Sequence, residues 1–151
     1  MDEAKNSLDY KELKNILPHA YPFLLIDRVE DYKKGESLVA IKNVTGNEWA
    51  HEDSNFQVNF FPETLLIEAA AQAALVLYHV SKVKPGQKRP RYFLCRTKAE
   101  FFKSVEVGDE IKFHIANGKM LDSGGYSDAT IVVGSSKIAD LELIFKVEKS
   151  D

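Results

Sequence analysis

A carboxylate inside a long apolar run is the feature that most constrains this chain. The run extends from Phe61 to Val80 and reads FPETLLIEAAAQAALVLYHV, with Glu68 and Gln72 one helical turn apart. Pro62 suits a first helical position, because its fixed φ is already helical. Apolar residues cover most of the cylinder, which is typical of a helix buried on nearly every side. The run therefore predicts one long core helix with other structure packed around it.

The polar residues of this helix allow two interpretations. They lie near one line at helical spacing, so they could form a narrow solvated stripe: Thr64, Glu68, Gln72, His79 and Lys82. Alternatively, Glu68 is a buried carboxylate hydrogen-bonded by the Gln72 amide, in an apolar setting that raises its pKa toward neutrality. Such a group suits general acid or base catalysis. A membrane span is not expected, since Glu and Gln would lie in its middle.

Composition predicts one soluble domain over residues 1–151, with 44% hydrophobic and 28% charged residues. The N-terminal residues include acidic side chains and no apolar signal core, so we expect a cytoplasmic protein. A net charge of −3 argues against general nucleic-acid binding. The four histidines lack paired ligand spacing, so no metal is expected. Cys95 is interpreted as a small core residue.

The remaining chain has the pattern of several strands and a short helix. A helix is expected at 11–17, and strands are expected at 23–32, 37–45, 91–102, 110–116, 126–134 and 136–148. Gly108-Asp109 and Gly124-Gly125 are interpreted as turns. Several strands and one apolar helix predict an α+β fold in which an antiparallel sheet wraps around the long helix.

Three stretches of this chain form a recognisable set of motifs: LPHAYPFLLIDRV at 17–29, AIKNVTGNE at 40–48 and FPETLLIEAAAQ at 61–72. They resemble the hotdog-fold 3-hydroxyacyl-acyl carrier protein (ACP) dehydratases of the FabZ/FabA type. The later segment YFLCRTKAEFFKSVEVGDEIKF is similar to the third strand of that family and its following turn. The similar stretches cover most of the chain in the order found in the family. The resemblance implies a hotdog fold and action on acyl chains carried by ACP in fatty acid, polyene or polyketide biosynthesis.

The resemblance also assigns roles to residues of the central helix. Glu68 takes the position of the catalytic carboxylate, interpreted as the acid, and Gln72 takes the supporting position. The family glycine whose backbone amide binds the thioester carbonyl is replaced by Glu63, so a side chain stands at the mouth of the expected acyl tunnel. The substrate is expected on the phosphopantetheine arm of ACP, and no separate cofactor is expected.

One departure from the family pattern concerns the catalytic histidine. The ungapped match places Ser54 where the family has that histidine, and serine has no suitable pKa for a base. We count Ser54 among the expected substrate-binding residues. His51, three residues earlier in the chain, could fill the vacant place after a shift of the loop, or it could be a solvated loop histidine. Asp53 is a weaker substitute.

Two alternatives to a shifted His51 stay open. Relatives of this type form dimers in which one subunit supplies the histidine and the other the carboxylate. A heterodimer with a histidine-bearing paralogue would keep one working site built with Glu68, and the same logic permits a noncatalytic ACP-binding subunit. Alternatively, the chain is a hotdog thioesterase, in which a helix carboxylate activates water and amides at the helix N-terminus stabilise the oxyanion. A homodimer and the hexamers of some relatives also stay open.

A basic segment directly after the long helix is the candidate docking surface for acidic ACP. Its members, besides Lys82, are Lys84, Lys88, Arg89 and Arg91. The alternative is a solvated loop that keeps the protein soluble. Phe93, Phe101 and Phe102 could line the acyl tunnel, although aromatic residues in strands are usually core. His19 is expected to brace the first strand rather than to exchange protons.

Overall fold

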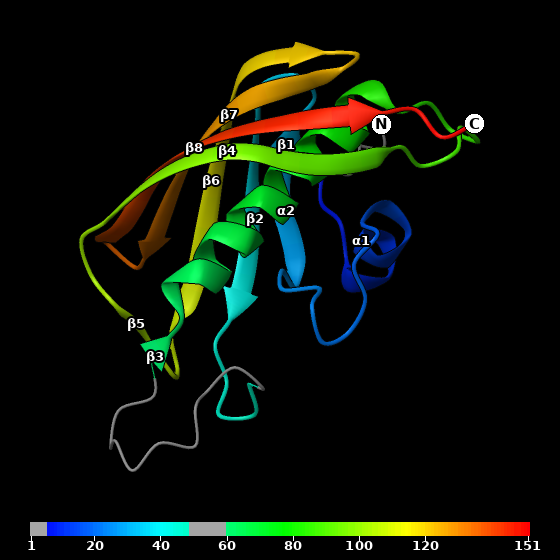
Figure 1. Ribbon diagram of the computed structural model, residues 1–151. Helices are drawn as coiled ribbons and strands as arrows, with labels where there is room; N and C mark the ends of the chain where they lie inside the picture. The colour runs from blue at the N-terminus through cyan, green and yellow to red at the C-terminus, as the bar shows by residue number, and fades with distance from the viewer. Residues whose placement is uncertain (1–5, 49–59) are drawn as a thin grey trace, which may run out of the picture.

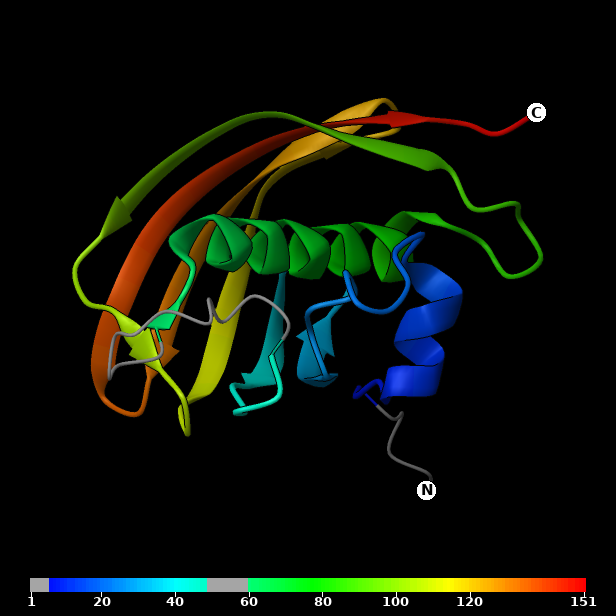
Figure 2. The same ribbon diagram turned by 60° about the horizontal axis from the view of Figure 1, so that its bottom comes forward.

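The computed structural model describes residues 6–48 and 60–151. A curved antiparallel sheet wraps around one long helix, α2 (Glu63–Lys82), as Figures 1 and 2 show from two directions. A second, short helix, α1 (Tyr10–Ile16), packs near the C-terminal end of α2. This is the hotdog architecture, and it confirms the predicted α+β fold. The core consists of α2 and the inner face of the sheet.

The main sheet has six strands in the order β1-β2-β6-β7-β8-β4, and each pair of neighbours is antiparallel. Their bounds are Arg28–Lys33 for β1, Ser37–Asn43 for β2, Arg91–Phe101 for β4, Glu110–Leu121 for β6, Gly124–Val133 for β7 and Ser136–Glu148 for β8. The short strands β3 (Phe60–Phe61) and β5 (Val105–Glu106) pair separately, next to the start of α2. All the predicted strands of the C-terminal half are therefore present.

Period-two alternation explains why these segments form strands. In β8, Leu141, Leu143 and Phe145 are buried against the helix, whereas the residues between them point away from it. The strands β6 and β7 are longer than predicted, because Gly124-Gly125 lies inside β7 rather than in a turn. A Cβ at Gly124 would lie 2.3 Å from the Phe145 carbonyl oxygen. These glycines therefore allow close approach of the neighbouring strands.

The long helix begins without a side-chain hydrogen bond that caps its N-terminus. Pro62 has an extended ψ of 135° and serves as the N-cap, so α2 begins at Glu63, one residue later than predicted. The Pro62 carbonyl accepts hydrogen bonds from the amides of Leu65 and Leu66. By length and hydropathy α2 would suit a membrane span, but 56% of the tested window is buried inside the fold. Its apolar surface serves as the core of the domain.

The two edges of the main sheet differ. The amide of Leu8 donates to the Val29 carbonyl and the amide of Val29 donates to the Leu8 carbonyl, so part of the β1 edge is paired. Strand β4 pairs with β8 on one side only, and most of its residues are exposed. Cys95 lies on this edge, at a register shift between Leu94 and Arg96, and is exposed. Its interpretation as a core residue was wrong, because within the described part of the chain no strand lies on that side of β4 to cover it.

The first predicted strand is shorter than expected. Residues 23–27 precede β1 and lie outside the described strands, although the Asp27 amide donates to the Ile41 carbonyl of β2 at 2.8 Å. Their position is fixed instead by hydrogen bonds to α2, including one from the Leu25 amide to Gln72 Oε1 at 2.9 Å. A tertiary contact therefore takes the place of the sheet pairing that the apolar pattern predicted.

Candidate active site

Glu68 lies in the second turn of α2 with its side chain 26% exposed. Gln72 follows one turn later and is fully buried. The Gln72 side-chain amide donates to Glu68 Oε1 at 3.1 Å, as the interpretation of a hydrogen-bonded carboxylate predicts. The alternative, a continuous solvated stripe, is wrong, because its central member Gln72 is excluded from solvent.

Gln72 also connects the helix to the segment before β1. Its Nε2 donates to the Phe23 carbonyl at 2.8 Å, and its Oε1 accepts from the Leu25 amide at 2.9 Å. A buried amide must satisfy its donors and its acceptor within the protein. Gln72 does so by binding this segment on one side and Glu68 on the other. The carboxylate is thereby fixed relative to residues far earlier in the chain.

His19 contributes the second contact of the carboxylate. Its Nε2 lies 3.2 Å from Glu68 Oε1, and its side chain is 22% exposed. The contact with the His19 imidazole lowers the pKa of Glu68 below its ordinary value, with a smaller contribution from Gln72 and against the opposing effect of burial. The predicted raised pKa of Glu68 was therefore wrong. The contacts of the Glu68 carboxylate with His19 and Gln72 lower its pKa by more than burial raises it.

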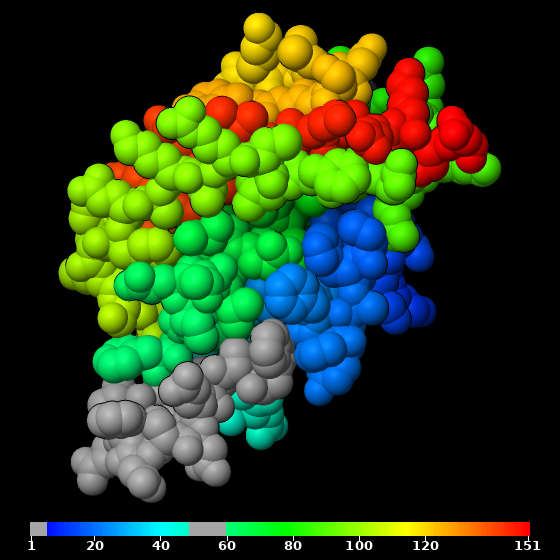
Figure 3. All heavy atoms as spheres, viewed as in Figure 1, coloured from blue at the N-terminus to red at the C-terminus, as the bar shows by residue number. Residues whose placement is uncertain are grey.

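His19 was not predicted as a site residue. The sequence placed it in the opening signature but gave no signal that this segment folds back onto the second turn of α2. The Phe23 ring lies next to it, with ring centroids 6.2 Å apart. In Figure 3 the segment around residues 20–27, in blue, and the N-terminal half of α2, in green, reach the surface side by side.

The N-terminus of α2 lies on the same side of the fold as Glu68. The first amides of a helix have no intrahelical acceptor, and Pro62 supplies no side-chain cap. The Glu63 and Thr64 side chains are exposed, so neither fills the core. The helix end can therefore offer backbone N–H groups to an oxygen atom of a ligand. His51 and Ser54, the other predicted site residues, lie outside the described residues.

The basic segment after α2 is already engaged in contacts within the chain. Arg89 donates to the Leu17 carbonyl at 2.8 Å, and Arg91 lies 3.2 Å from a Glu148 carboxylate oxygen. Lys88 donates to the carbonyl of Asp151. Within residues 6–48 and 60–151, Lys84 has no side-chain ion pair or hydrogen bond. Its ammonium group is thus the one of the four predicted docking charges that has no such contact within the described part of the chain.

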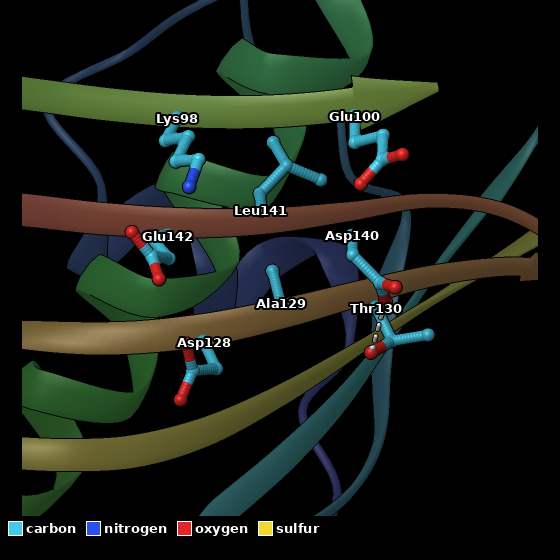
Figure 4. Close-up of a pocket in the computed structure, with 8 residues that line it drawn as sticks. All are labelled: Lys98, Glu100, Asp128, Ala129, Thr130, Asp140, Leu141 and Glu142. Atoms are coloured by element: carbon cyan, nitrogen blue, oxygen red, sulfur yellow. Dashed lines mark hydrogen bonds between the residues drawn. The ribbon is translucent and has the colours of Figure 1, made fainter. Parts of the chain in front are cut away.

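A polar hollow on the outer face of the sheet lies away from this site. Figure 4 shows two cross-strand rows that point away from α2. One row contains Lys98, Glu142 and Asp128, and the other contains Glu100, Asp140 and Thr130. Among the residues that the structure describes, no group of three potential ligands could hold a metal ion.

Comparison with known proteins decides the family. A family model described as a FabA-like domain matches residues 17–148. The chain belongs to this family. The 3-hydroxyacyl-[acyl-carrier-protein] dehydratase FabZ of Clostridium kluyveri is 37% identical over 137 residues, which cover 91% of this chain and 94% of that protein. The resemblance to FabZ-type dehydratases is thus confirmed, and Glu68 lies within the matched region.

Solved structures agree with the hotdog fold of this FabA-like chain. One is the dehydratase heterocomplex ApeI:P from Xenorhabdus doucetiae, with a TM-score of 0.75, 14% identity and coverage of 92% of this chain and 91% of that one. Another is a mutant thioesterase from Pseudomonas aeruginosa, with a TM-score of 0.70, 12% identity and coverage of 99% and 98%. At these identities the similarity establishes the fold and leaves the reaction to be argued from the site.

Proposed function

We propose that this FabA-like protein takes part in the dehydration of 3-hydroxyacyl groups carried by ACP, with Glu68 as the catalytic carboxylate. One observation carries the proposal. Glu68 lies on the core helix, and the side chains of Gln72 and His19 hold its carboxylate, in a chain that matches FabZ over most of its length. A carboxylate fixed in this way can exchange a proton with a substrate placed beside it. Gln72 and Glu63 are proposed to position that substrate.

Dehydration moves two protons. A base removes a proton from C2, beside the thioester carbonyl, and an acid delivers a proton to the hydroxyl that leaves C3 as water. The family resemblance implies that a histidine and a carboxylate share this work, and we propose from the ungapped match that Ser54 takes the position of the histidine. His51 and a histidine of a partner subunit are the two sources of the second group that the family pattern suggests. Ser54 is then a substrate contact rather than a base.

The exposed edge of β4 is the proposed dimer interface. Phe93 and Leu94 are each 44% exposed on this strand. Behind it, a cavity of about 20 Å³ is lined by apolar side chains of α2 and the sheet: Ala71, Ala74, Leu75, Leu94, Leu143 and Phe145. A long unpaired strand with exposed apolar residues favours pairing with another chain. The partner is a second copy of this chain or a dehydratase paralogue. The similar fold of the ApeI:P heterocomplex is a reason to retain the paralogue as an alternative to the second copy. A hexamer built from three such dimers is a further option.

ACP is the proposed carrier of the substrate, and the basic segment is its proposed docking surface. The relative from Clostridium kluyveri is named for an acyl-carrier-protein substrate. Lys84 is proposed to meet the acidic carrier first, because Lys88, Arg89 and Arg91 already contact oxygen atoms of this chain. A cytoplasmic location and the absence of a separate cofactor stay predictions.

Thioester hydrolysis is the second candidate function. The lowered pKa of Glu68 favours it, because an ionised carboxylate can activate a water molecule directly. The backbone amides at the start of α2 could then stabilise the oxyanion. A noncatalytic ACP-binding subunit is the third outcome that the experiment must separate.

Intact mass spectrometry tests the function directly. Purified protein is incubated with a 3-hydroxyacyl-ACP, and loss of 18 Da from the carrier reports enoyl-ACP, whereas release of free ACP thiol reports hydrolysis. We expect enoyl-ACP in wild type and its loss, by about 10²-fold or more, in Glu68→Gln. Glu142→Gln, which removes an exposed carboxylate of β8 away from the site, is the matched control for the loss of a carboxylate. Thiol without enoyl product would contradict dehydration.

A second variant locates the missing base. His51→Ala should abolish turnover if the loop histidine replaces the family histidine, and should leave turnover intact if another group does so. Inactive wild-type protein that gains activity on mixing with a histidine-bearing paralogue would instead establish a heterodimeric enzyme. No turnover in either case would support the noncatalytic subunit.

A further inference from the structure

Both neighbours of the Glu68 carboxylate bind the same oxygen. Gln72 Nε2 lies 3.1 Å from Oε1, and His19 Nε2 lies 3.2 Å from that same atom. Oε2 has no hydrogen-bond or ion-pair partner among residues 6–48 and 60–151. One oxygen is therefore fixed by the protein, and the other is left for an incoming group.

The position of the His19 ring determines what it can do. Its Nδ1 is buried and has no hydrogen-bond partner in the described part of the chain, so a proton on that atom would be buried without an acceptor. A neutral ring with its proton on Nε2 satisfies the geometry, because Nε2 faces the carboxylate. In that state His19 donates to Glu68 and has no proton to supply to a substrate.

The segment that carries His19 is fixed on both sides of the residue. Arg89 donates to the Leu17 carbonyl before it, and Gln72 binds Phe23 and Leu25 after it. Asp27, the other carboxylate of this segment, accepts from the Asn43 amide at 2.7 Å on the neighbouring strand. His19 is therefore the one described side chain with an ionisable ring or acid that contacts Glu68.

We propose that His19 is a positioning residue that holds Glu68 as a carboxylate through Oε1, so that Glu68 enters the reaction as the base through Oε2. This inference rests on the proposed dehydratase function and reverses the acid role implied by the family pattern. It also gives a reaction that needs no histidine at the position of Ser54.

One carboxylate is sufficient for both proton transfers of the proposed reaction. Oε2 takes the C2 proton of the 3-hydroxyacyl thioester, and the electron pair of that C–H bond forms the C2–C3 double bond as the C3–O bond breaks. Glu68, now a carboxylic acid, returns the same proton to the departing hydroxyl, which leaves as water. His19 and Gln72 stay bound to Oε1 throughout, so the carboxylate ends in its starting state.

Titration of Glu68 itself tests the role of His19 without relying on turnover. The carboxyl carbon is followed by NMR in protein labelled with ¹³C at the glutamate side-chain carboxyl, and Glu68→Gln identifies its signal. We expect the Glu68 midpoint to rise in His19→Phe, which keeps a ring beside Phe23 but removes the donor. His79→Phe, which alters a half-buried histidine of α2 away from Glu68, should leave the midpoint unchanged. An unchanged midpoint in His19→Phe would overturn the inference.

The pH dependence of kcat/KM for enoyl-ACP formation tests the base role. The acidic limb should move to higher pH in His19→Phe, with a loss of about 10²-fold at low pH that shrinks as pH rises. His19→Gln keeps an N–H donor. It should restore part of the activity and return the acidic limb of the pH profile part of the way to its wild-type position. Equal loss at all pH values in both variants would contradict a base held by His19. If the midpoint rises in the NMR titration but no variant, wild type included, forms enoyl-ACP, the proposed function fails while the contact stands.

Discussion

Lys42 Nζ lies 3.1 Å from Glu48 Oε1, and the two side chains are only 7% and 12% exposed. The same ammonium group lies 5.4 Å from the centroid of the Phe61 ring. Glu48 follows β2 in the chain, and Phe61 directly precedes the N-cap of α2. This contact therefore ties the residues that enter the central helix to the strand that packs behind it.

Removing the ammonium group should destabilise the protein strongly. Lys42→Met leaves the Glu48 carboxylate nearly buried without its counter-ion, which should cost about 3 kcal/mol of unfolding free energy. Urea denaturation at pH 7 measures the change. Lys33→Met is the matched control, because Lys33 and Glu36 form a contact of 2.8 Å at side-chain exposures of 70% and 59%. The control should leave the free energy of unfolding nearly unchanged, and equal losses in the two variants would contradict the importance of burial.

Gln72 should stabilise the fold as well as the site. Gln72→Leu keeps the volume in the core but removes the acceptor of the Leu25 amide and one donor to the Phe23 carbonyl, which should cost about 2 kcal/mol. Gln87→Leu changes an exposed glutamine and should cost much less. Hydrogen exchange of the Leu25 amide gives a local readout, and protection that survives in Gln72→Leu would contradict the assigned contact.

The stability of the protein should fall as the pH is lowered from neutrality. Burial, with a smaller contribution from Arg89, holds the pKa of His79 below its ordinary value of 6.5. The unfolded chain therefore takes up the proton first, and stability that is complete above pH 6.5 is lost as pH falls through the lower, folded pKa. His79→Phe should have a smaller loss of melting temperature between pH 7.5 and 5.5 than wild type. Equal slopes would exclude this contribution.

Glu68 should add a second loss of stability at lower pH. Its pKa is lowered from 4.5 in the folded protein, so its stabilising contribution is present above pH 4.5 and disappears as pH falls below that value. Glu68→Gln removes this contribution and should flatten the dependence of melting temperature on pH only in that acidic range. A flattening between pH 7.5 and 5.5 would contradict the assignment.

Charge on the β4 edge should prevent self-association. We expect the purified chain to form a homodimer, and Leu94→Asp should convert it to a monomer in light scattering coupled to size-exclusion chromatography, because it places a carboxylate in an apolar interface. Leu121→Asp is the matched control, since Leu121 is similarly exposed, at 48% against 44%, at the end of β6. A monomeric wild type would contradict the homodimer and direct the search to a paralogue.

Local patterns were sufficient for most secondary structure. The apolar run at 61–80 predicted α2, and period-two alternation predicted β8 with its observed bounds. The pair Gly124-Gly125 was misassigned, because glycine serves both turns and close strand contacts. Only the closeness of the Phe145 carbonyl on the neighbouring strand shows that Gly124 serves a strand contact rather than a turn.

The site was predicted in part for a similar reason. Glu68 and Gln72 are one helical turn apart, so their contact follows from helix geometry alone. His19 is far from Glu68 in sequence, and its approach depends on the hydrogen bonds that fold residues 23–25 onto α2. The direction of the Glu68 pKa shift was wrong because the sequence shows the apolar neighbours of a helix but not a histidine brought from another segment.

The sequence by itself determined the core helix, the family and the carboxylate on which the chemistry depends, because helix periodicity and motif spacing are local properties of the chain. The tertiary structure alone decided which side chains hold that carboxylate and which of its oxygens is left open. It also decided that β4, rather than β1, is the strand whose outer edge lacks a neighbour among the described residues. These are long-range outcomes, since they depend on how the segments pack against one another and not on their order along the chain.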